Sequence, residues 1–125
     1  MSELLITGGT LVTDGRKDFA DVLIRNGRIE KIDSSIPAPP HARIIEAGGK
    51  WILPGLIDDQ VHFREPGLTH KATIATESQA AVAGGVTTFF EMPNVSPPTL
   101  SMEKLEEKQS IASRDSVANL SLIHI

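Results

Sequence analysis

The first part of the chain alternates short apolar runs with turn-forming residues. The clearest instance lies at 21–32, where two runs rich in aliphatic and β-branched residues are separated by Asn26-Gly27. Because Asn-Gly adopts the positive φ angles of a type I′ turn, this segment predicts a β-hairpin. The proline-rich stretch at 34–40 predicts a surface connection, since proline lacks the N–H that a sheet interior needs. With a last strand at 43–46, the pattern predicts a small antiparallel sheet.

The pattern changes after an apolar run at 51–57, where helical and strand-like segments begin to alternate. In order, we predict a helix at 70–83 with Thr69 as its N-cap, a strand at 86–92, a helix at 99–114 and a strand at 116–125. Alternating strands and helices imply parallel strands joined by helical crossovers, and therefore an α/β fold. We expect two domains, a β domain at 1–53 and an α/β domain at 54–125.

Composition places the chain among soluble globular proteins. Its 125 residues are 40% hydrophobic and 22% charged, with a formal net charge of −4. The absence of a basic patch argues against nucleic acid as a partner, and leaves small molecules or further copies of the same chain. No cysteine is present, which excludes a thiolate metal site. Neither a signal peptide nor an apolar run of the ~20 residues that span a bilayer is found, so we expect a cytoplasmic protein and no membrane partner.

Polar and charged residues that could bind a ligand or take part in catalysis concentrate at 58–67. If this segment begins as a strand, its alternating residues share one face. Those residues are Asp58, Gln60, His62 and Arg64. Polar groups side by side at the carboxyl end of a parallel strand favour a ligand site, because ligands bind there in α/β folds. The alternative is a structural histidine at a strand end among surface charges.

Two motifs carry a resemblance to a known family. The runs Leu-Pro-Gly-Leu-Ile-Asp at 53–58 and Val-His-Phe-Arg-Glu-Pro-Gly at 61–67 resemble the first barrel-strand signature of dihydroorotases and related cyclic amidohydrolases. The runs at 83–88 and 91–94, ending in Glu-Met-Pro-Asn, are similar to the second-strand signature. The resemblance implies a small N-terminal β-sandwich, then a (β/α)8 TIM-type barrel, and zinc-assisted hydrolysis of a ring amide.

Only the start of such a barrel fits in this chain. A (β/α)8 barrel takes about 250 residues, so the barrel is expected to be incomplete here. The general base that the resemblance implies is expected beyond residue 125, and no catalytic residue of that kind is expected within it. We therefore expect the 125 residues alone to be inactive.

The resemblance also assigns substrate-binding residues. In dihydroorotases an arginine two residues after the histidine and a Met-Pro-Asn after the second strand hold the substrate carboxylate, and Arg64 and Asn94 match them. This implies hydrolysis of dihydroorotate to N-carbamoyl-aspartate in pyrimidine biosynthesis. Allantoinases typically have asparagine where Arg64 stands. The alternatives are a surface salt bridge from Arg64 to Glu65 or a nearby acid, and a turn-forming role for Asn94.

One position departs from the family pattern. Two histidines spaced i, i+2 are the usual metal ligands, and Gln60 replaces the first of them. A glutamine carbonyl is a poorer zinc ligand than imidazole. His62, with weaker contributions from Gln60 and Asp58, is the metal position that we predict. The alternatives are a non-catalytic dihydroorotase-like scaffold protein and a related enzyme such as an allantoinase or hydantoinase.

Overall fold

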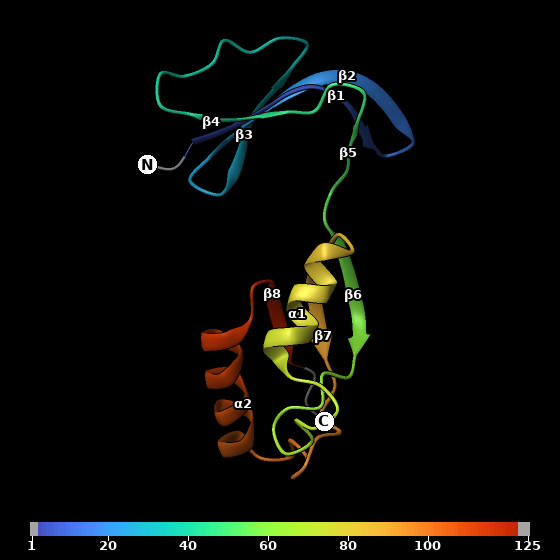
Figure 1. Ribbon diagram of the computed structural model, residues 1–125, viewed down its shortest axis with the longest axis vertical. Coiled ribbons are helices and arrows are strands. Elements are labelled where there is room, and N and C mark those ends of the chain that lie inside the picture. The colour runs from blue at the N-terminus through green and yellow to red at the C-terminus, as the bar shows by residue number, and fades with distance from the viewer. Residues whose placement is uncertain (1–2, 123–125) are drawn as a thin grey trace. The chain divides into compact units, whose positions relative to one another are not determined.

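The computed structural model describes residues 3–122. The chain divides into two compact units, the first ending at Pro54 and the second beginning at Gly55 (Figure 1). Each unit has its own sheet and its own apolar core. No helix among the described residues is long and apolar enough to cross a membrane.

The first unit is one mixed β-sheet. Its strands are β1 (Glu3–Thr13), β2 (Arg16–Arg25), β3 (Arg28–Asp33), β4 (Arg43–Glu46) and β5 (Trp51–Ile52). They lie in the order β3-β2-β1-β4, with β5 also pairing with β1. β1–β2 and β2–β3 are antiparallel, whereas β4 and β5 run parallel to β1. The expectation of an antiparallel sheet was therefore wrong, and the described residues of this unit form one sheet, without the second sheet of a sandwich.

The predicted hairpin is confirmed. Asn26 and Gly27 have φ angles of 51° and 75° and join β2 to β3. The connection after β3 is held to the sheet by Asp21, whose Oδ1 accepts the N–H of Gly8 at 2.8 Å and whose Oδ2 accepts that of Ile36 at 2.9 Å. The proline-rich segment therefore lies against the sheet through Ile36, which is buried with Leu5.

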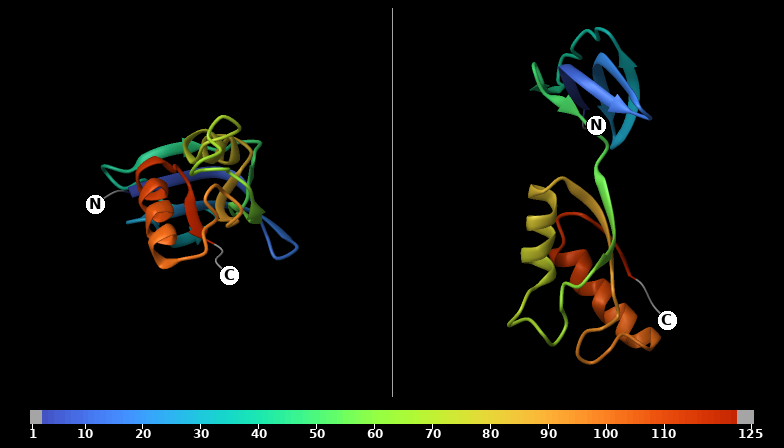
Figure 2. Two further views of the ribbon diagram at one scale, coloured as in Figure 1. Left: turned by 90° about the horizontal axis from the view of Figure 1, so that it is seen from below. Right: turned by 90° about the vertical axis from the view of Figure 1, so that its right-hand side faces the viewer.

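The second unit alternates strands and helices, as predicted. It consists of β6 (Leu56–Val61), α1 (Ile74–Ala83), β7 (Val86–Glu91), α2 (Met102–Asp115) and β8 (Asn119–Leu122). The strand order is β6-β7-β8, and both pairs are parallel (Figure 2). The core between sheet and helices contains Phe63, Ile74, Phe89 and Ala112. The α/β prediction for this unit is confirmed, and the carboxyl ends of β6 and β7 meet at one edge.

Three predicted boundaries differ from the structure. α1 begins at Ile74, not at residue 70, because Thr73 and Thr76 form a capping box in which each side chain binds the backbone N–H of the other. α2 begins at Met102, since Ser101 is its N-cap. The last strand begins at Asn119, and the final three residues of the predicted strand lie outside the described residues.

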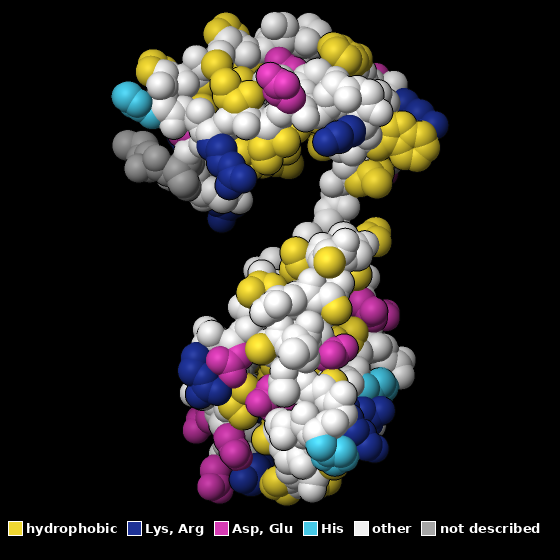
Figure 3. Space-filling model, in the orientation of Figure 1, with side chains coloured by type: hydrophobic (Ala, Val, Ile, Leu, Met, Phe, Trp, Pro, Cys, Tyr) yellow, Lys and Arg dark blue, Asp and Glu magenta, His cyan; other side chains and the backbone are white. Residues whose placement is uncertain are grey.

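β6 has large apolar side chains in contact with solvent. Leu56 is 59% exposed and Ile57 is 66% exposed. Apolar side chains are visible at the surface of both units (Figure 3). Strands of parallel sheets are normally covered on both faces, so β6 has an apolar surface that its own unit does not bury.

Candidate active site at the ends of β6 and β7

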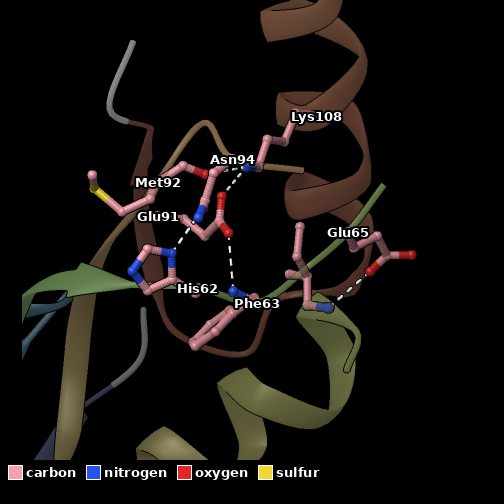
Figure 4. A network of polar contacts seen from close by, with 8 residues as sticks. His62, Phe63, Glu65, Glu91, Met92, Asn94 and Lys108 are labelled. Atoms are coloured by element: carbon pink, nitrogen blue, oxygen red, sulfur yellow. Dashed lines mark hydrogen bonds and ion pairs between the residues drawn. The ribbon is translucent and has the colours of Figure 1, made fainter. Parts of the chain in front are cut away.

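The two sequence motifs meet through one hydrogen bond. His62 follows the last residue of β6, and Asn94 lies in the loop after β7. The His62 Nδ1 and Asn94 Oδ1 atoms are 2.8 Å apart (Figure 4). An amide oxygen only accepts, so Nδ1 carries a proton, and in the neutral imidazole Nε2 then carries a free lone pair. The structure therefore joins two predicted site residues and leaves one imidazole nitrogen available to a ligand.

The predicted common face of the strand does not extend as far as Arg64. The pairing of β6 with β7 is irregular between Asp58 and Val61, and Arg64 has a φ of 67°, outside the strand conformation. Asp58 and Gln60 are exposed, and Asp58 Oδ1 accepts the backbone N–H of Gln60 at 3.1 Å. The Arg64 side chain forms no hydrogen bond or ion pair with another residue in the range 3–122.

Glu65 has a structural role that differs from the alternative considered for it. Its Oε2 accepts the backbone N–H of Ile74 at 2.8 Å, at the first turn of α1. A carboxylate at a helix N-terminus satisfies an unpaired N–H and interacts favourably with the helix dipole. Within the described residues, Glu65 therefore binds α1 and forms no salt bridge with Arg64. Sequence reasoning missed this contact, because nine residues separate the two partners.

The loops after β6 and β7 are packed backbone against backbone. Ser96 N donates to Pro66 O at 3.2 Å, and Gly67 has a φ of 84°. A Cβ atom built on Gly67 would overlap the carbonyl group of Ser96. Glycine at this position therefore allows the two motif-bearing loops to approach each other.

Gly67→Ala is expected to destabilise the protein more than Gly85→Ala. Both glycines have positive φ, but a Cβ on Gly85 would meet nothing within 4 Å. The two variants share the conformational cost of alanine at positive φ, and only Gly67→Ala adds a steric overlap, so the difference should be about 1–3 kcal/mol. Thermal unfolding of both variants measures it. Equal melting temperatures would show that the two loops do not pack as described.

A buried ion pair contacts the backbone next to His62 and at the end of β7. Glu91 is 0% exposed and Lys108, from α2, is 1% exposed. Glu91 Oε1 accepts the N–H of Phe63 at 2.9 Å, and Glu91 Oε2 is paired with Lys108 Nζ. Lys108 Nζ also donates to Met92 O at 2.8 Å. Burial lowers the pKa of Lys108 to about 8, which still leaves the amine mostly charged at neutral pH.

Sequence reasoning missed this pair, although a signal was present. Lys108 is three residues after Leu105 and four before Ala112, and so lies on the apolar stripe of α2. A charged residue on such a stripe indicates a buried partner, because an unpaired charge is costly in a protein interior. The sequence does not reveal that the partner is Glu91, the first residue of the motif at 91–94, in which only Asn94 was assigned a role.

The described residues supply only part of a zinc site. In the range 3–122, no three histidine, aspartate or glutamate side chains lie close enough together to hold a metal ion. His62 fits a metal ligand, since a carbonyl oxygen holds its Nδ1–H and leaves Nε2 for coordination. Asp58 Oδ1 accepts the backbone N–H of Gln60, and Asp58 does not form a group of three such side chains with His62 among the described residues.

Comparison with known proteins agrees with this arrangement. The model of the family described as "Dihydro-orotase-like" matches residues 49–124. An allantoinase of Deinococcus radiodurans is 39% identical over 96% of this chain and 27% of its own length. A dihydroorotase of Enterococcus faecalis is 38% identical over 96% of this chain and 28% of its own length. Similarity in sequence alone therefore does not separate these two activities.

Solved structures show the same fold. The L-hydantoinase (dihydropyrimidinase) from Arthrobacter aurescens superimposes with a TM-score of 0.90 at 28% identity, over 98% of this chain and 27% of that one. A D-hydantoinase from Thermus sp. gives a TM-score of 0.81 at 32% identity, over 95% of this chain and 26% of that one. The chain thus spans about a quarter of the length of the proteins it matches. On this evidence the chain belongs to the dihydro-orotase-like family, whose matched members are cyclic-amide hydrolases.

Proposed function

We propose that the protein acts as a dihydroorotase, which hydrolyses the ring amide of dihydroorotate to N-carbamoyl-aspartate. The observation that supports this choice is Arg64, a long side chain whose backbone has a φ of 67° two residues after His62, the residue that contacts Asn94. Positive φ is unfavourable for most L-residues and is tolerated best by glycine and asparagine. An arginine kept in this conformation is explained by its guanidinium, whose fork binds a carboxylate through two parallel bonds.

The substrate carboxylate distinguishes the candidate activities. Dihydroorotate carries a carboxylate, whereas allantoin and hydantoin rings do not. Asn94 complements Arg64, because its Oδ1 is occupied by His62 and its amide N–H groups remain as donors. Arg64 and Asn94 together would therefore hold the carboxylate at the carboxyl ends of β6 and β7.

His62 is proposed as a zinc ligand through Nε2, with Asn94 fixing the tautomer. Asp58 and Gln60 would be weaker contributors, since both are exposed and Gln60 offers only a neutral oxygen. Zinc bound at such a site lowers the pKa of a coordinated water and polarises the ring amide. Within this chain, His62 would bind the zinc ion, and Arg64 and Asn94 would bind the substrate.

The family also indicates the complete fold, the remaining site residues and the assembly that we propose. The β6-β7-β8 sheet with its helices would be the first part of a (β/α)8 barrel, which agrees with the apolar surface of β6 that its own unit leaves exposed. The general base and further metal ligands would come from later strands. A cytoplasmic homo-oligomer acting on a small-molecule substrate is the form that we propose.

Turnover of three ring substrates by the complete protein tests the proposal. With zinc supplied, we expect hydrolysis of dihydroorotate and rejection of allantoin and hydantoin by roughly 10⁴-fold, because a site built to bind a polar group discriminates strongly against analogues that lack it. Preference for allantoin or hydantoin would overturn the proposed substrate.

A second candidate function is a non-catalytic scaffold. The observation that favours it is the single imidazole at the ends of β6 and β7, with Gln60 at the position where the family usually has a histidine. Such a protein would keep the fold and the His62–Asn94 contact without zinc or turnover. Lack of hydrolysis of all three substrates by zinc-loaded protein would favour it.

Gln60→His is expected to tighten zinc binding at least about tenfold, because changes in the outer shell of a metal site already alter the affinity by that much. The substitution adds a second imidazole near the end of β6, two residues before His62. Asp59→His is the matched control, because it adds an imidazole one residue away, at a position outside the i, i+2 spacing of the two ligand histidines of the family pattern. Zinc content after dialysis against a weak chelator is the measurement. Equal retention by the two variants would contradict Gln60 as a ligand position.

A further inference from the structure

The two peptide groups that flank His62 are both held by the end of β7. Val61 O, in the peptide group before His62, accepts the N–H of Met92 at 3.0 Å. Phe63 N, in the peptide group after it, donates to Glu91 Oε1 at 2.9 Å (Figure 4). The first contact continues the backbone ladder of two parallel strands. The second replaces a ladder contact with a side chain, at the point where β6 has ended.

The carboxylate of Glu91 is itself held from the helix layer. Lys108 Nζ is paired with Glu91 Oε2 and donates to Met92 O at 2.8 Å. Glu91 and Lys108 are both fully enclosed, so neither can touch a substrate. The chain of contacts runs from α2 through the end of β7 to the backbone of His62, and Asn94 follows two residues after Met92.

We infer that Glu91 positions the imidazole of His62 against Asn94, and that Lys108 neutralises the buried carboxylate of Glu91. This inference rests on the proposed function for its catalytic consequence, but the geometry of His62 can be tested without it. Rotation about the His62 backbone would move Nδ1 away from Asn94 Oδ1, and both flanking peptide groups must be fixed to prevent it. Because β6 ends at Val61, no strand hydrogen bond holds the peptide group after His62, and Glu91 Oε1 holds it instead.

Two double variants separate the hydrogen bond from the charge. Glu91→Gln with Lys108→Met removes both charges and keeps an oxygen that accepts the Phe63 N–H. Glu91→Leu with Lys108→Met removes the charges and the acceptor. The positioning role predicts that the Gln/Met protein retains the His62 geometry and that the Leu/Met protein loses it.

Ser78→Ala is the matched control for general destabilisation. Ser78 is fully buried, and its Oγ accepts the N–H of Val117 at 3.2 Å. The substitution therefore also deprives a backbone N–H of its side-chain acceptor, but at the start of β8, away from the carboxyl ends of β6 and β7. A purely structural role for Glu91 predicts similar effects of the Leu/Met and Ser78→Ala changes on every readout.

The experiment uses the complete protein labelled with ¹⁵N-histidine. Nitrogen resonances of His62, assigned with a His62→Gln variant, report whether the proton stays on Nδ1. Zinc affinity and kcat/KM for dihydroorotate are measured on the same samples. We expect the Leu/Met protein to lose the Nδ1–H tautomer and roughly 10- to 100-fold in zinc affinity and kcat/KM, while the Gln/Met and Ser78→Ala proteins remain near wild type.

The possible results separate the two proposals. An unchanged His62 tautomer in the Leu/Met protein would overturn the positioning role, whether or not the protein is active. Equal losses in the Leu/Met and Ser78→Ala proteins would overturn it as well. Wild-type protein without zinc binding or turnover would defeat the proposed function, and the tautomer comparison would still decide the positioning role. If the Leu/Met protein does not fold, a Gln/Met protein that lacks the Nδ1–H tautomer overturns the inference, and one that keeps it supports the inference.

Discussion

Lys108→Met alone is expected to lower the free energy of unfolding by about 3–5 kcal/mol, because it leaves the buried carboxylate of Glu91 without its counter-ion. Lys108 is 1% exposed and Glu91 is 0% exposed, so water cannot replace the missing partner without opening the core. Methionine matches the length of the lysine stem, and therefore the effect isolates the charge from packing. Loss of the bond from Lys108 Nζ to Met92 O adds to the cost.

Pairing this change with Glu91→Gln is expected to recover most of the loss. Replacing both members of a buried ion pair by neutral groups is often nearly neutral, whereas removing one member is not. Thermal unfolding of the wild type, the two single variants and the double variant gives the coupling energy. Lys104→Met is the control, since Lys104 lies on the same helix and its ion pair with Glu107 is exposed to solvent, which makes such a pair worth little. Additive effects of the two buried changes would contradict a coupled pair.

The contrast between these two lysines shows what the sequence of α2 reveals. Lys104 and Lys108 are one turn apart and so lie on the same side of α2, yet Lys104 is partly exposed and Lys108 is buried. The helical period predicts the side of the helix that faces the core, but not how deeply each residue on that side is buried. It does not predict the partner, because Glu91 comes from a strand that lies next to the helix only after the unit has folded.

In the first unit, strand direction was predictable only where a turn decides it. Asn26-Gly27 forces the chain to reverse within two residues, and so the antiparallel pairing of β2 with β3 follows from local chemistry. β4 follows a connection at 34–42 whose sequence contains no comparable rule, and it pairs parallel to β1. The side chain of Asp21 and the burial of Ile36 position that connection, and both are contacts between distant residues.

The start of α1 shows a second limit of local reasoning. Thr69 and Thr73 are both acceptable N-caps, and propensity does not choose between them. The choice is made by contacts outside the helix, since Glu65 binds the N–H of Ile74 and Gly67 lies against Ser96. The loop at 64–71 is thereby held in turns and cannot join the helix.

At the candidate site, the sequence indicated which residues to consider and not how they are arranged. Family resemblance pointed to His62 and Asn94, and the structure places them in contact. Simple strand alternation put Asp58, Gln60 and Arg64 on the same face as His62, but the irregular pairing of β6 and the positive φ of Arg64 interrupt that alternation. Alternation holds only while a strand remains regular, and functional residues at strand ends lie where it stops.

Arg64→Asn is expected to increase stability and to abolish efficient use of dihydroorotate. Asparagine tolerates the φ of 67° better than arginine, so the free energy of unfolding should rise by about 0.5–1 kcal/mol. The guanidinium forms no hydrogen bond or ion pair with another residue in the range 3–122, and therefore its removal breaks no contact there. Opposite changes in stability and activity would indicate that the strained conformation is retained for function.

Arg64→Lys separates the fork from the backbone strain. Lysine keeps the charge and the unfavourable φ, but its ammonium cannot form two parallel bonds to a carboxylate. Each lost charge-assisted bond contributes roughly 1.5–3 kcal/mol, so kcat/KM for dihydroorotate should fall at least tenfold while the melting temperature stays near wild type. Steady-state kinetics and thermal unfolding of the complete protein provide both values. A kcat/KM that is unchanged in both variants would remove Arg64 from substrate binding, and with it the argument that favours dihydroorotate over an uncharged ring.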